Sequence, residues 1–542
     1  MAGSVLENLS TKKLIVVLSS LLVLQVVFFA IGGMFAPSPT SYMEFDMIKC
    51  RDQKRGQSKS WFHHSNCDYI DHLSEYTPTS FDMREIVFVA KMPHARENVT
   101  LEYSPWFQFL LGVLHVDVEY SDHFRYIKDA NLLLEVRMGY RKSVNDPWTD
   151  LTSSNVSRVL DCSIADGDKK EGNSYTCEPL NLFEFGSSSY PFYLVNIRIP
   201  INQAACRYNP KAENCQIGKI TGLRLIEIHQ NGGFTLVWLW MKTMISPIVI
   251  AGVIWFWRRV DNLARKPLLL EKSILFLGVS LVLLDFPLEW ISLTTHVPFL
   301  LLLSDLRQGL FYTVLLTFWL IFAGEHLVDE SERNQLTSYR FNLGFIVVGS
   351  GALLTYDLIE KGFQLYNPFH TVWSSEKGTM FAMFIINIGI ICTFIYFAFL
   401  VHKVVKVWRT IRGKRSAQIY RNSAESRLKT ESVIYRFKFL MLFTLLCAGL
   451  TITAYYLKQQ GEAQLHSDEA RDSYLLGSTS AFFTGTFGMV NIYVLLLLAM
   501  YAPSHKHYRG ATQLLDDDNE VIDDNSTTES NVLTTFLKPS ND

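Results

Sequence analysis

The sequence predicts a polytopic α-helical membrane protein that also carries a β-sandwich domain. The 542-residue chain is 49% hydrophobic, and its apolar residues are concentrated in eight long runs. A run of about 18 or more apolar residues is long enough to cross a bilayer as a helix. The segment between the first and second runs instead alternates apolar and polar residues, which is typical of strands. The same segment holds six of the eight cysteines, as expected of a domain in an oxidising compartment.

Each apolar run predicts one membrane-spanning helix. The runs are Leu14–Ala36, Phe234–Trp257, Ser273–Leu293, Leu306–Ala323, Phe341–Leu358, Met380–Val401, Tyr435–Leu457 and Gly477–Tyr501. The first run is longer than the apolar core of about 7–15 residues in a cleaved signal peptide, so we interpret it as an uncleaved anchor. Gly33 and Ala36 leave signal-peptide cleavage possible. The remaining seven runs favour a bundle like that of G-protein-coupled receptors.

The distribution of Lys and Arg predicts that both termini are cytoplasmic, because cytoplasmic loops collect these residues. Lys12 and Lys13 precede the first run, and the loop after the sixth run is strongly basic. The acidic tail segment Leu514–Asp524 should be disordered. The expected domains are a cytoplasmic N-terminus (1–13), an anchor helix (14–36), a lumenal β-sandwich (37–233), a seven-helix bundle (234–501) and a cytoplasmic tail (502–542).

The lumenal segment reads as an antiparallel β-sandwich. In the stretch Leu114–Tyr120, residues 114, 116, 118 and 120 form an apolar face, and residues 115, 117 and 119 form a polar one. Val195–Ile201 repeats this pattern. Further strand candidates are Glu85–Ala90, Asn131–Met138 and Gly222–Ile228.

The lumenal cysteines form three pairs that are local in sequence. Six cysteines allow 15 pairings, and their grouping predicts Cys50–Cys67, Cys162–Cys177 and Cys206–Cys215. A metal site is the alternative, but no C-x-x-C motif or matched histidine spacing supports one. The sequons at Asn98 and Asn155 predict N-glycosylation, while those at Asn8 and Asn525 should stay bare on the cytoplasmic side.

The sequence lacks the common motifs of catalytic sites, and it therefore predicts a non-enzyme without cofactor or metal. It contains no H-E-x-x-H motif, no G-x-S-x-G elbow and no glycine-rich phosphate loop. His326 and His402 lie at the ends of apolar runs rather than at their centres. The net charge of −2 gives no indication of nucleic-acid binding. A transporter of lipids or small solutes with a lumenal sensor domain is the alternative, although the repeated halves common in transporters are absent.

Many sequence segments of the chain resemble segments of the Wntless family. They occur in the same order and together span about residues 1–506. They are MAGSVLENLSTKKL, SPWFQFLLG, FYLVNIRIPIN, HQNGGFT, PLEW, SDLRQGLFY, FAGEH, YRFKFLML, SAFFTGTFGM and YAPSHK. The resemblance implies a lumenal β-sandwich, an anchor helix and a receptor-like bundle. It implies a carrier that binds palmitoleoylated Wnt proteins in the endoplasmic reticulum and escorts them through the Golgi to the cell surface. Membrane lipid, and retromer and endocytic adaptors on the cytoplasmic side, are the other implied partners, with retrieval through endosomes.

The fourth apolar run contains polar residues that suggest a cargo cavity. Charge inside a membrane is costly and usually faces a cavity, a neighbouring helix or the water boundary. We expect Asp305, Arg307 and Gln308 to form a polar mouth. The residues expected to line the acyl-chain cavity below it are Phe311, Tyr312, Leu315, Phe482 and Phe483. The alternative is structural: Asp305 and Arg307 are two residues apart, so each would pair with a different helix.

One departure from the family pattern concerns sorting. Vertebrate members carry a tyrosine-based endocytic signal before the seventh run. Here the corresponding word is Tyr435-Arg-Phe-Lys, which ends in a charge, and Leu514-Leu515 lacks the upstream acid of a dileucine signal. The divergent tail and the missing motif are typical of an invertebrate member.

Overall fold

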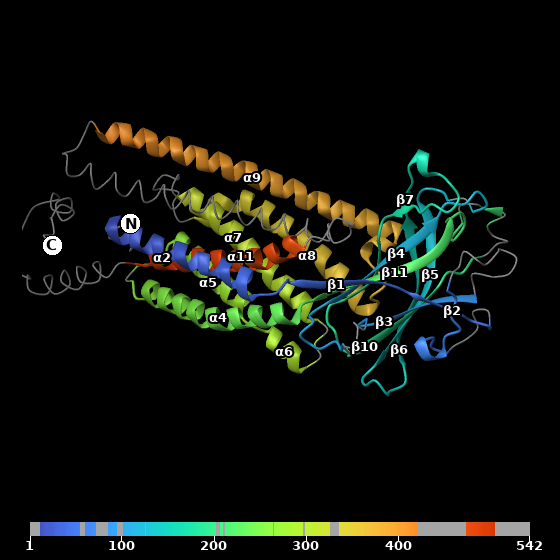
Figure 1. Cartoon of the computed structure of the whole chain (residues 1–542). Helices are drawn as coiled ribbons and strands as arrows, with labels where there is room; N and C mark the ends of the chain where they lie inside the picture. The colour runs from blue at the N-terminus through green and yellow to red at the C-terminus, as the bar shows by residue number, and fades with distance from the viewer. Residues whose placement is uncertain are drawn as a thin grey trace, which may run out of the picture.

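The fold was analysed in a computed structural model, in which a rod-like bundle of helices carries a β-domain at one end (Figure 1). The structure describes residues 11–54, 60–71, 85–94, 101–124, 126–201, 206, 208–209, 212–263, 265–295, 297, 299–325, 335–419 and 473–503.

The β-domain is a sandwich of two antiparallel sheets, as expected. One sheet has the strand order β1-β11-β4-β9, and the other has the order β2-β3-β10-β5-β6. A short hairpin, β7-β8, accompanies them. The strands are β1 Thr40–Asp46, β2 Ile48–Arg51, β3 Ile86–Met92, β4 Leu110–Glu119, β5 Ala130–Arg141, β6 Thr149–Leu160, β7 Cys162–Ser163, β8 Thr176–Cys177, β9 Leu180–Phe185, β10 Phe192–Arg198 and β11 Lys219–Gln230.

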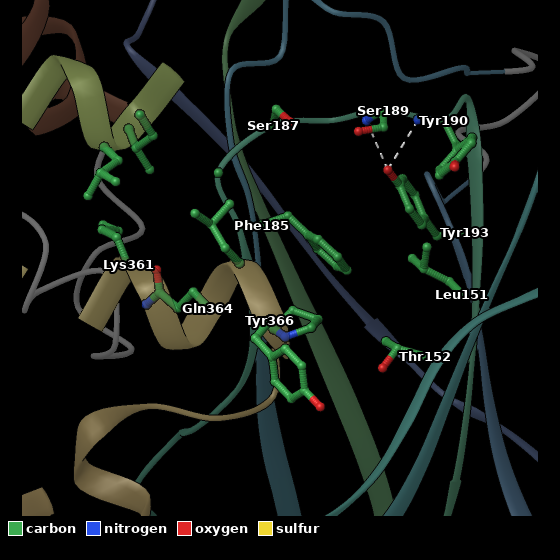
Figure 2. Close-up of a pocket in the computed structure, with 15 residues that line it drawn as sticks. Leu151, Thr152, Phe185, Ser187, Ser189, Tyr190, Tyr193, Lys361, Gln364 and Tyr366 are labelled. Atoms are coloured by element: carbon green, nitrogen blue, oxygen red, sulfur yellow. Dashed lines mark hydrogen bonds between the residues drawn. The ribbon is translucent and has the colours of Figure 1, made fainter. Parts of the chain in front are cut away.

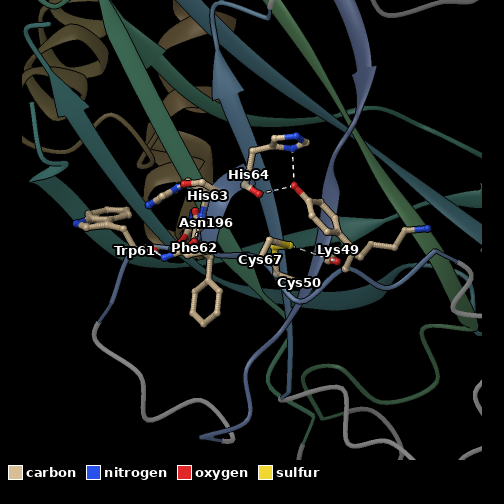
Figure 3. The surroundings of a disulfide bond; sticks show 11 residues. Lys49, Cys50, Trp61, Phe62, His63, His64, Cys67 and Asn196 are labelled. Atoms are coloured by element: carbon tan, nitrogen blue, oxygen red, sulfur yellow. Dashed lines mark hydrogen bonds between the residues drawn. A yellow bond between two sulfur atoms is a disulfide. The ribbon is translucent and has the colours of Figure 1, made fainter. Parts of the chain in front are cut away.

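The period-two pattern holds for β4 but not for β10. In β4, Leu114, Val116 and Val118 are buried in the core between the sheets, and the residues between them are partly exposed. In β10, both faces are buried from Phe192 to Ile197. The cause is a segment that crosses the outer face, where the Asn196 amide accepts a hydrogen bond from Phe62 N (2.9 Å) and donates one to Phe62 O (3.0 Å). Figure 3 shows this segment beside the first disulfide.

The three local cysteine pairs are bonded in the structure. Cys50–Cys67 ties the covering segment to β2 (Figure 3). Cys162–Cys177 links β7 to β8, which lie side by side in the hairpin. Cys206–Cys215 closes the shortest loop, with a sequence separation of 9.

Seven helices in the described part of the chain are long and apolar enough to cross a membrane. The eighth expected span, Tyr435–Leu457, lies outside the described residues. The seven described spans are α2 Thr11–Ala30 with its π-helical extension η1 Ile31–Phe35, α4 Gly232–Asp261, α5 Leu269–Asp285 together with the short helix α6 Glu289–Thr294, α7 Leu300–Glu325, α8 Arg340–Tyr366, α9 Glu376–Ile419 and α11 Ser473–Tyr501.

The third apolar run is not one continuous helix, contrary to the expectation for Ser273–Leu293. Helix α5 ends at Asp285, and the short helix α6 begins at Glu289. Pro287 explains the break, because proline lacks an N–H group and disfavours the helical conformation of the preceding residue. Phe286 accordingly has an extended backbone, with φ −61° and ψ 120°. The break leaves backbone carbonyls of the last α5 turn in need of a donor.

Helix α2 packs into the bundle against α11, so the first span is more than a separate anchor. The Thr484 hydroxyl donates to Phe28 O (2.7 Å), and the Gln25 amide donates to Gly485 O (2.8 Å). A Cβ at Gly32 would lie 2.1 Å from Thr484 Oγ1 and 2.5 Å from Ala481 Cα. Small residues at this contact therefore allow the two backbones to approach closely, as is common between membrane helices.

The substitution Gly32→Ala should lower the unfolding temperature of the purified protein, since overpacking typically costs about 1–3 kcal/mol. Gly33→Ala is a matched control, because the nearest heavy atom to its Cβ would be Ala481 Cβ at 3.6 Å, an ordinary contact. Thermal unfolding in detergent measures both. Equal unfolding temperatures for the two variants would contradict the close α2–α11 contact.

The β-domain is docked on the bundle through the loop after α8. Phe369 in this loop is fully buried in the core of the β-domain. Its carbonyl accepts a hydrogen bond from Arg158 Nη2 on β6 (2.8 Å), and Pro368 O accepts one from Glu184 N at the end of β9 (3.0 Å). A residue of the bundle thus completes the β-domain core, and the two parts are held as one unit.

Candidate functional site

A pocket of about 290 Å³ lies at the junction between the β-domain and the ends of α7 and α8 (Figure 2). Its apolar wall is formed by Leu151, Phe185, Tyr190, Tyr193, Leu301, Leu302, Leu365 and Pro368. Its polar wall includes Thr152, Ser187, Ser189, Lys361, Gln364 and Tyr366. Ligand pockets usually measure about 300–1,000 Å³, so this one is at the small end of that range.

Tyr193 holds the loop that closes one side of the pocket. The loop connects β9 to β10, and the Tyr193 hydroxyl accepts hydrogen bonds from Ser189 N (3.1 Å) and Tyr190 N (3.2 Å), as Figure 2 shows. Burial raises the pKa of the Tyr193 phenol, which therefore stays protonated at neutral pH. The Tyr190 ring stacks on Tyr140 of β5 at 3.8 Å between centroids. These contacts fix the loop against the sheet and preform the pocket wall.

The polar wall is anchored by Glu184 on β9. Its carboxylate accepts from Lys361 Nζ (2.7 Å) and from Gln364 Nε2 (2.8 Å), both on α8. Asp305 on α7 also interacts electrostatically with Lys361. A line of alternating charges therefore crosses from the β-domain over α8 to α7, beside the apolar wall.

The structure separates Asp305 and Arg307, which the sequence analysis grouped as one mouth. Asp305 is half-buried and interacts electrostatically with Lys361 on α8, whereas Arg307 is buried among α5, α6 and α7. The Arg307 guanidinium donates to Phe286 O (2.8 Å) and Leu283 O (3.3 Å), carbonyls left open by the α5 break. Arg307 also forms an ion pair with Glu289 (3.3 Å). These contacts favour the structural interpretation of Arg307, the alternative given above, over a place in the cavity mouth.

The partners of Arg307 form a buried charge cluster that the sequence analysis did not identify. Glu289 on α6 also accepts from Lys242 Nζ on α4 at 2.7 Å. Asp285, at the end of α5, is fully buried and interacts with Lys242 and Arg307. All three missed residues are charged groups within or beside predicted spans. Charge within a membrane span is the signal that points to Arg307, and the same signal points to these three residues.

The predicted cavity residues lie in separate places, and none of them lines the junction pocket. Phe311 and Leu315 are buried in the bundle core, while Gln308 and Tyr312 are half-buried. Phe482 and Phe483 are on α11, where the Phe483 ring lies 6.2 Å from that of Phe234 on α4. Half-buried Asp305, Gln308 and Tyr312 follow Leu301 at helical spacing, so these four residues share one face of α7.

Of the predicted glycosylation and sorting sites, the structure describes one. Asn155 is exposed on β6, where a glycan can be accommodated. Asn98, Asn8, Asn525, Tyr435 and Leu514 lie outside the described residues.

Comparison with known proteins places nearly the whole chain in one family. Residues 48–230 match the family model "Wntless, GOLD domain", and residues 231–505 match "Wntless-like, transmembrane domain". The chain is similar to the "Protein wntless homolog" of Caenorhabditis elegans, with 66% identity and 100% of each chain covered. It is 40% identical to the proteins of the same name from Mus musculus and Homo sapiens, over 94% of this chain and 92% of theirs.

Proposed function

Because the chain belongs to the Wntless family, we propose that it is a non-enzymatic carrier that binds lipid-modified Wnt proteins and escorts them to the cell surface. The observation that best supports this function is the junction pocket. It combines an apolar wall with a line of charges at the point where the β-domain meets the membrane helices. A lipidated protein presents these two chemistries together, an acyl chain and the polar segment to which that chain is attached.

We propose that the pocket is the entrance of the acyl chain. Exposing a hydrocarbon chain to water costs about 0.8 kcal/mol per CH₂, so a carrier has to cover most of a 16-carbon chain. The pocket volume of about 290 Å³ suits an entrance better than a complete site. The face of α7 that carries Leu301, Asp305, Gln308 and Tyr312 continues from the pocket wall into the membrane. The chain would follow this face, while Arg307 holds α7 against α5 and α6 behind it.

The other residues predicted to line the acyl-chain cavity can also be assigned positions along this path. Phe311 and Leu315 lie on the side of α7 that faces the bundle core, and they would form the inner boundary of the path. Phe482 and Phe483 on α11 would contribute only if the path reached the opposite side of the bundle.

Tyr312→Trp should weaken capture of acylated Wnt about tenfold, because added bulk in a tight apolar site costs about 1–3 kcal/mol. Leu310→Trp is the matched control: Leu310 is on the same helix, two residues away, and is exposed on the outside of the bundle. Full-length variants would be compared for co-purification with acylated and unacylated Wnt. Equal capture by both tryptophan variants would exclude the proposed face of α7.

The same assay tests the alternative function. A transporter of lipids or small solutes has no need to retain a lipidated protein. If the purified carrier held no Wnt from cells that make the acylated form, the transporter would be favoured over the carrier.

We further propose that the β-domain is lumenal, that both termini are cytoplasmic, and that the carrier cycles through endoplasmic reticulum, Golgi, plasma membrane and endosomes. Retromer and endocytic adaptors would act on the cytoplasmic side. The basic loops after the second and sixth runs support this orientation.

Glycosidase treatment should release sugar from Asn98 and Asn155 but not from Asn8 or Asn525. Mass spectrometry of the four peptides, before and after treatment, measures the outcome. Sugar at Asn525 would reverse the assignment of the C-terminus.

A further inference from the structure

One surface of the β-domain gathers cations that the proposed carrier function does not use. It lies on the outer face of the five-stranded sheet and consists of His63, Lys91, Arg141, Lys142 and Trp148, which we call the basic–aromatic surface. Arg141 ends β5 and is paired with Phe192, the first residue of β10. Lys91 is near the end of β3, the strand on the other side of β10. His63 belongs to the covering segment beside the Cys50–Cys67 disulfide (Figure 3).

These cations have few acidic partners among the described residues. Asp150 is paired with Arg137 (2.9 Å), which leaves Asp146 as the acid that interacts with Arg141. Burial and then the charge of Arg141 lower the pKa of Lys91, and the same two causes lower the pKa of His63. The charge of Arg141 thus adds to burial in disfavouring the charged form of Lys91, and it helps to keep the His63 ring neutral at pH 7. An anion bound between them would relieve this repulsion.

Aromatic rings hold the cations in place. The Arg141 guanidinium lies 4.6 Å from the centroid of Trp148 and 4.9 Å from that of Phe192. Lys91 Nζ is 5.9 Å from the same Phe192 ring. Arg141 Nη1 donates to Val144 O (2.7 Å), while its buried Nε has no hydrogen-bond partner in the described part of the chain. The two rings and the Nη1 hydrogen bond therefore hold the guanidinium in one position.

We propose that the basic–aromatic surface binds a sulfated polysaccharide. Its cations Lys91 and Arg141 lie on β3 and β5, on either side of the buried Phe192 of β10, rather than converging on a pocket. Two interstrand spacings separate β3 from β5, about 10 Å, so the cations suit a chain of anionic groups better than a single small anion. The partly exposed Trp148 ring adds an apolar face against which a sugar ring can pack. An acidic peptide offers negative charge but no sugar ring for that face.

The test is binding of a fluorescent heparin oligosaccharide to the purified full-length protein, measured by anisotropy at several salt concentrations. Wild-type binding should weaken steeply as salt rises, as expected for ionic contacts. The double variant Lys91→Gln/Arg141→Gln should bind at least tenfold more weakly. Lys91→Gln/Lys142→Gln changes two surface side chains that form no ion pair within the described part of the chain, so it should weaken binding and leave folding intact.

The matched control is Lys128→Gln/Lys169→Gln, which removes the same charge from two exposed lysines that are already paired, with Asp161 and Asp166. Its affinity should stay within about twofold of wild type. An equal loss in this control, or no loss in both surface variants, would overturn the proposal. Equally tight binding of unsulfated heparosan, or of poly-glutamate, would also overturn the assignment to a sulfated polysaccharide, and the latter would point to an acidic peptide.

Discussion

Replacing Arg307 with methionine should lower the free energy of unfolding by about 3–5 kcal/mol, the usual cost of breaking a buried ion pair by removing one partner. The Arg307 guanidinium is 8% exposed and forms an ion pair with Glu289. Without it, Lys242 would be the one ion-pair partner left to Glu289 among the described residues. The substitution also leaves Leu283 O and Phe286 O without the donor that closes the α5 break. Methionine has a similar length, so the loss arises from charge and hydrogen bonding rather than from a cavity.

Urea or thermal unfolding of the purified protein in detergent measures this effect. Arg137→Met is a suitable control, because its ion pair with Asp150 is more exposed (30% and 61%) than that of Arg307 with Glu289 (8% and 13%), and surface pairs contribute at most about 1 kcal/mol. If Arg307→Met unfolded like wild type but failed to capture Wnt, Arg307 would belong to the cargo path after all. Loss of both stability and capture, with intact capture in Arg137→Met, is the result that the structure leads us to expect.

The double substitution Cys162→Ser/Cys177→Ser should cost about 3 kcal/mol, the chain-entropy value for a loop of about 15 residues. The bond closes a loop with a sequence separation of 15, and both cysteines belong to the core of the β-domain. Removing both sulfurs together avoids the exchange reactions of a single unpaired thiol. We expect the variant to be retained in the endoplasmic reticulum.

Cys392→Ser is the control for this experiment. Cys392 is a free, buried cysteine on α9, and its replacement breaks no bond. Surface delivery of both variants can be followed by biotinylation, and stability by denaturant unfolding in non-reducing buffer. Normal delivery and unchanged stability of the double variant would show that the Cys162–Cys177 bond does little for the fold.

Local signals in the amino-acid sequence are sufficient to predict several of the elements. Apolar runs such as Gly477–Tyr501 predict spans from length alone, and β4 alternates because one of its faces meets the other sheet. The cysteine pairs followed from their spacing, since a short loop keeps two thiols near each other. These features depend on residues close in the chain, so periodicity and composition carry them.

The helix that each polar side chain contacts becomes known from the packing of the folded chain. Asp305 and Arg307 are two residues apart on α7, yet one interacts with Lys361 on α8 and the other with Glu289 on α6. The covering of β10 by Phe62 and the insertion of Phe369 into the β-domain likewise join residues far apart in sequence. The junction pocket arises from the same kind of contact, between β9, α7 and α8. Such contacts depend on how whole helices and strands rotate and pack against each other. A sequence pattern predicts which side chains share a face of a helix or strand, but it does not predict which element packs against that face.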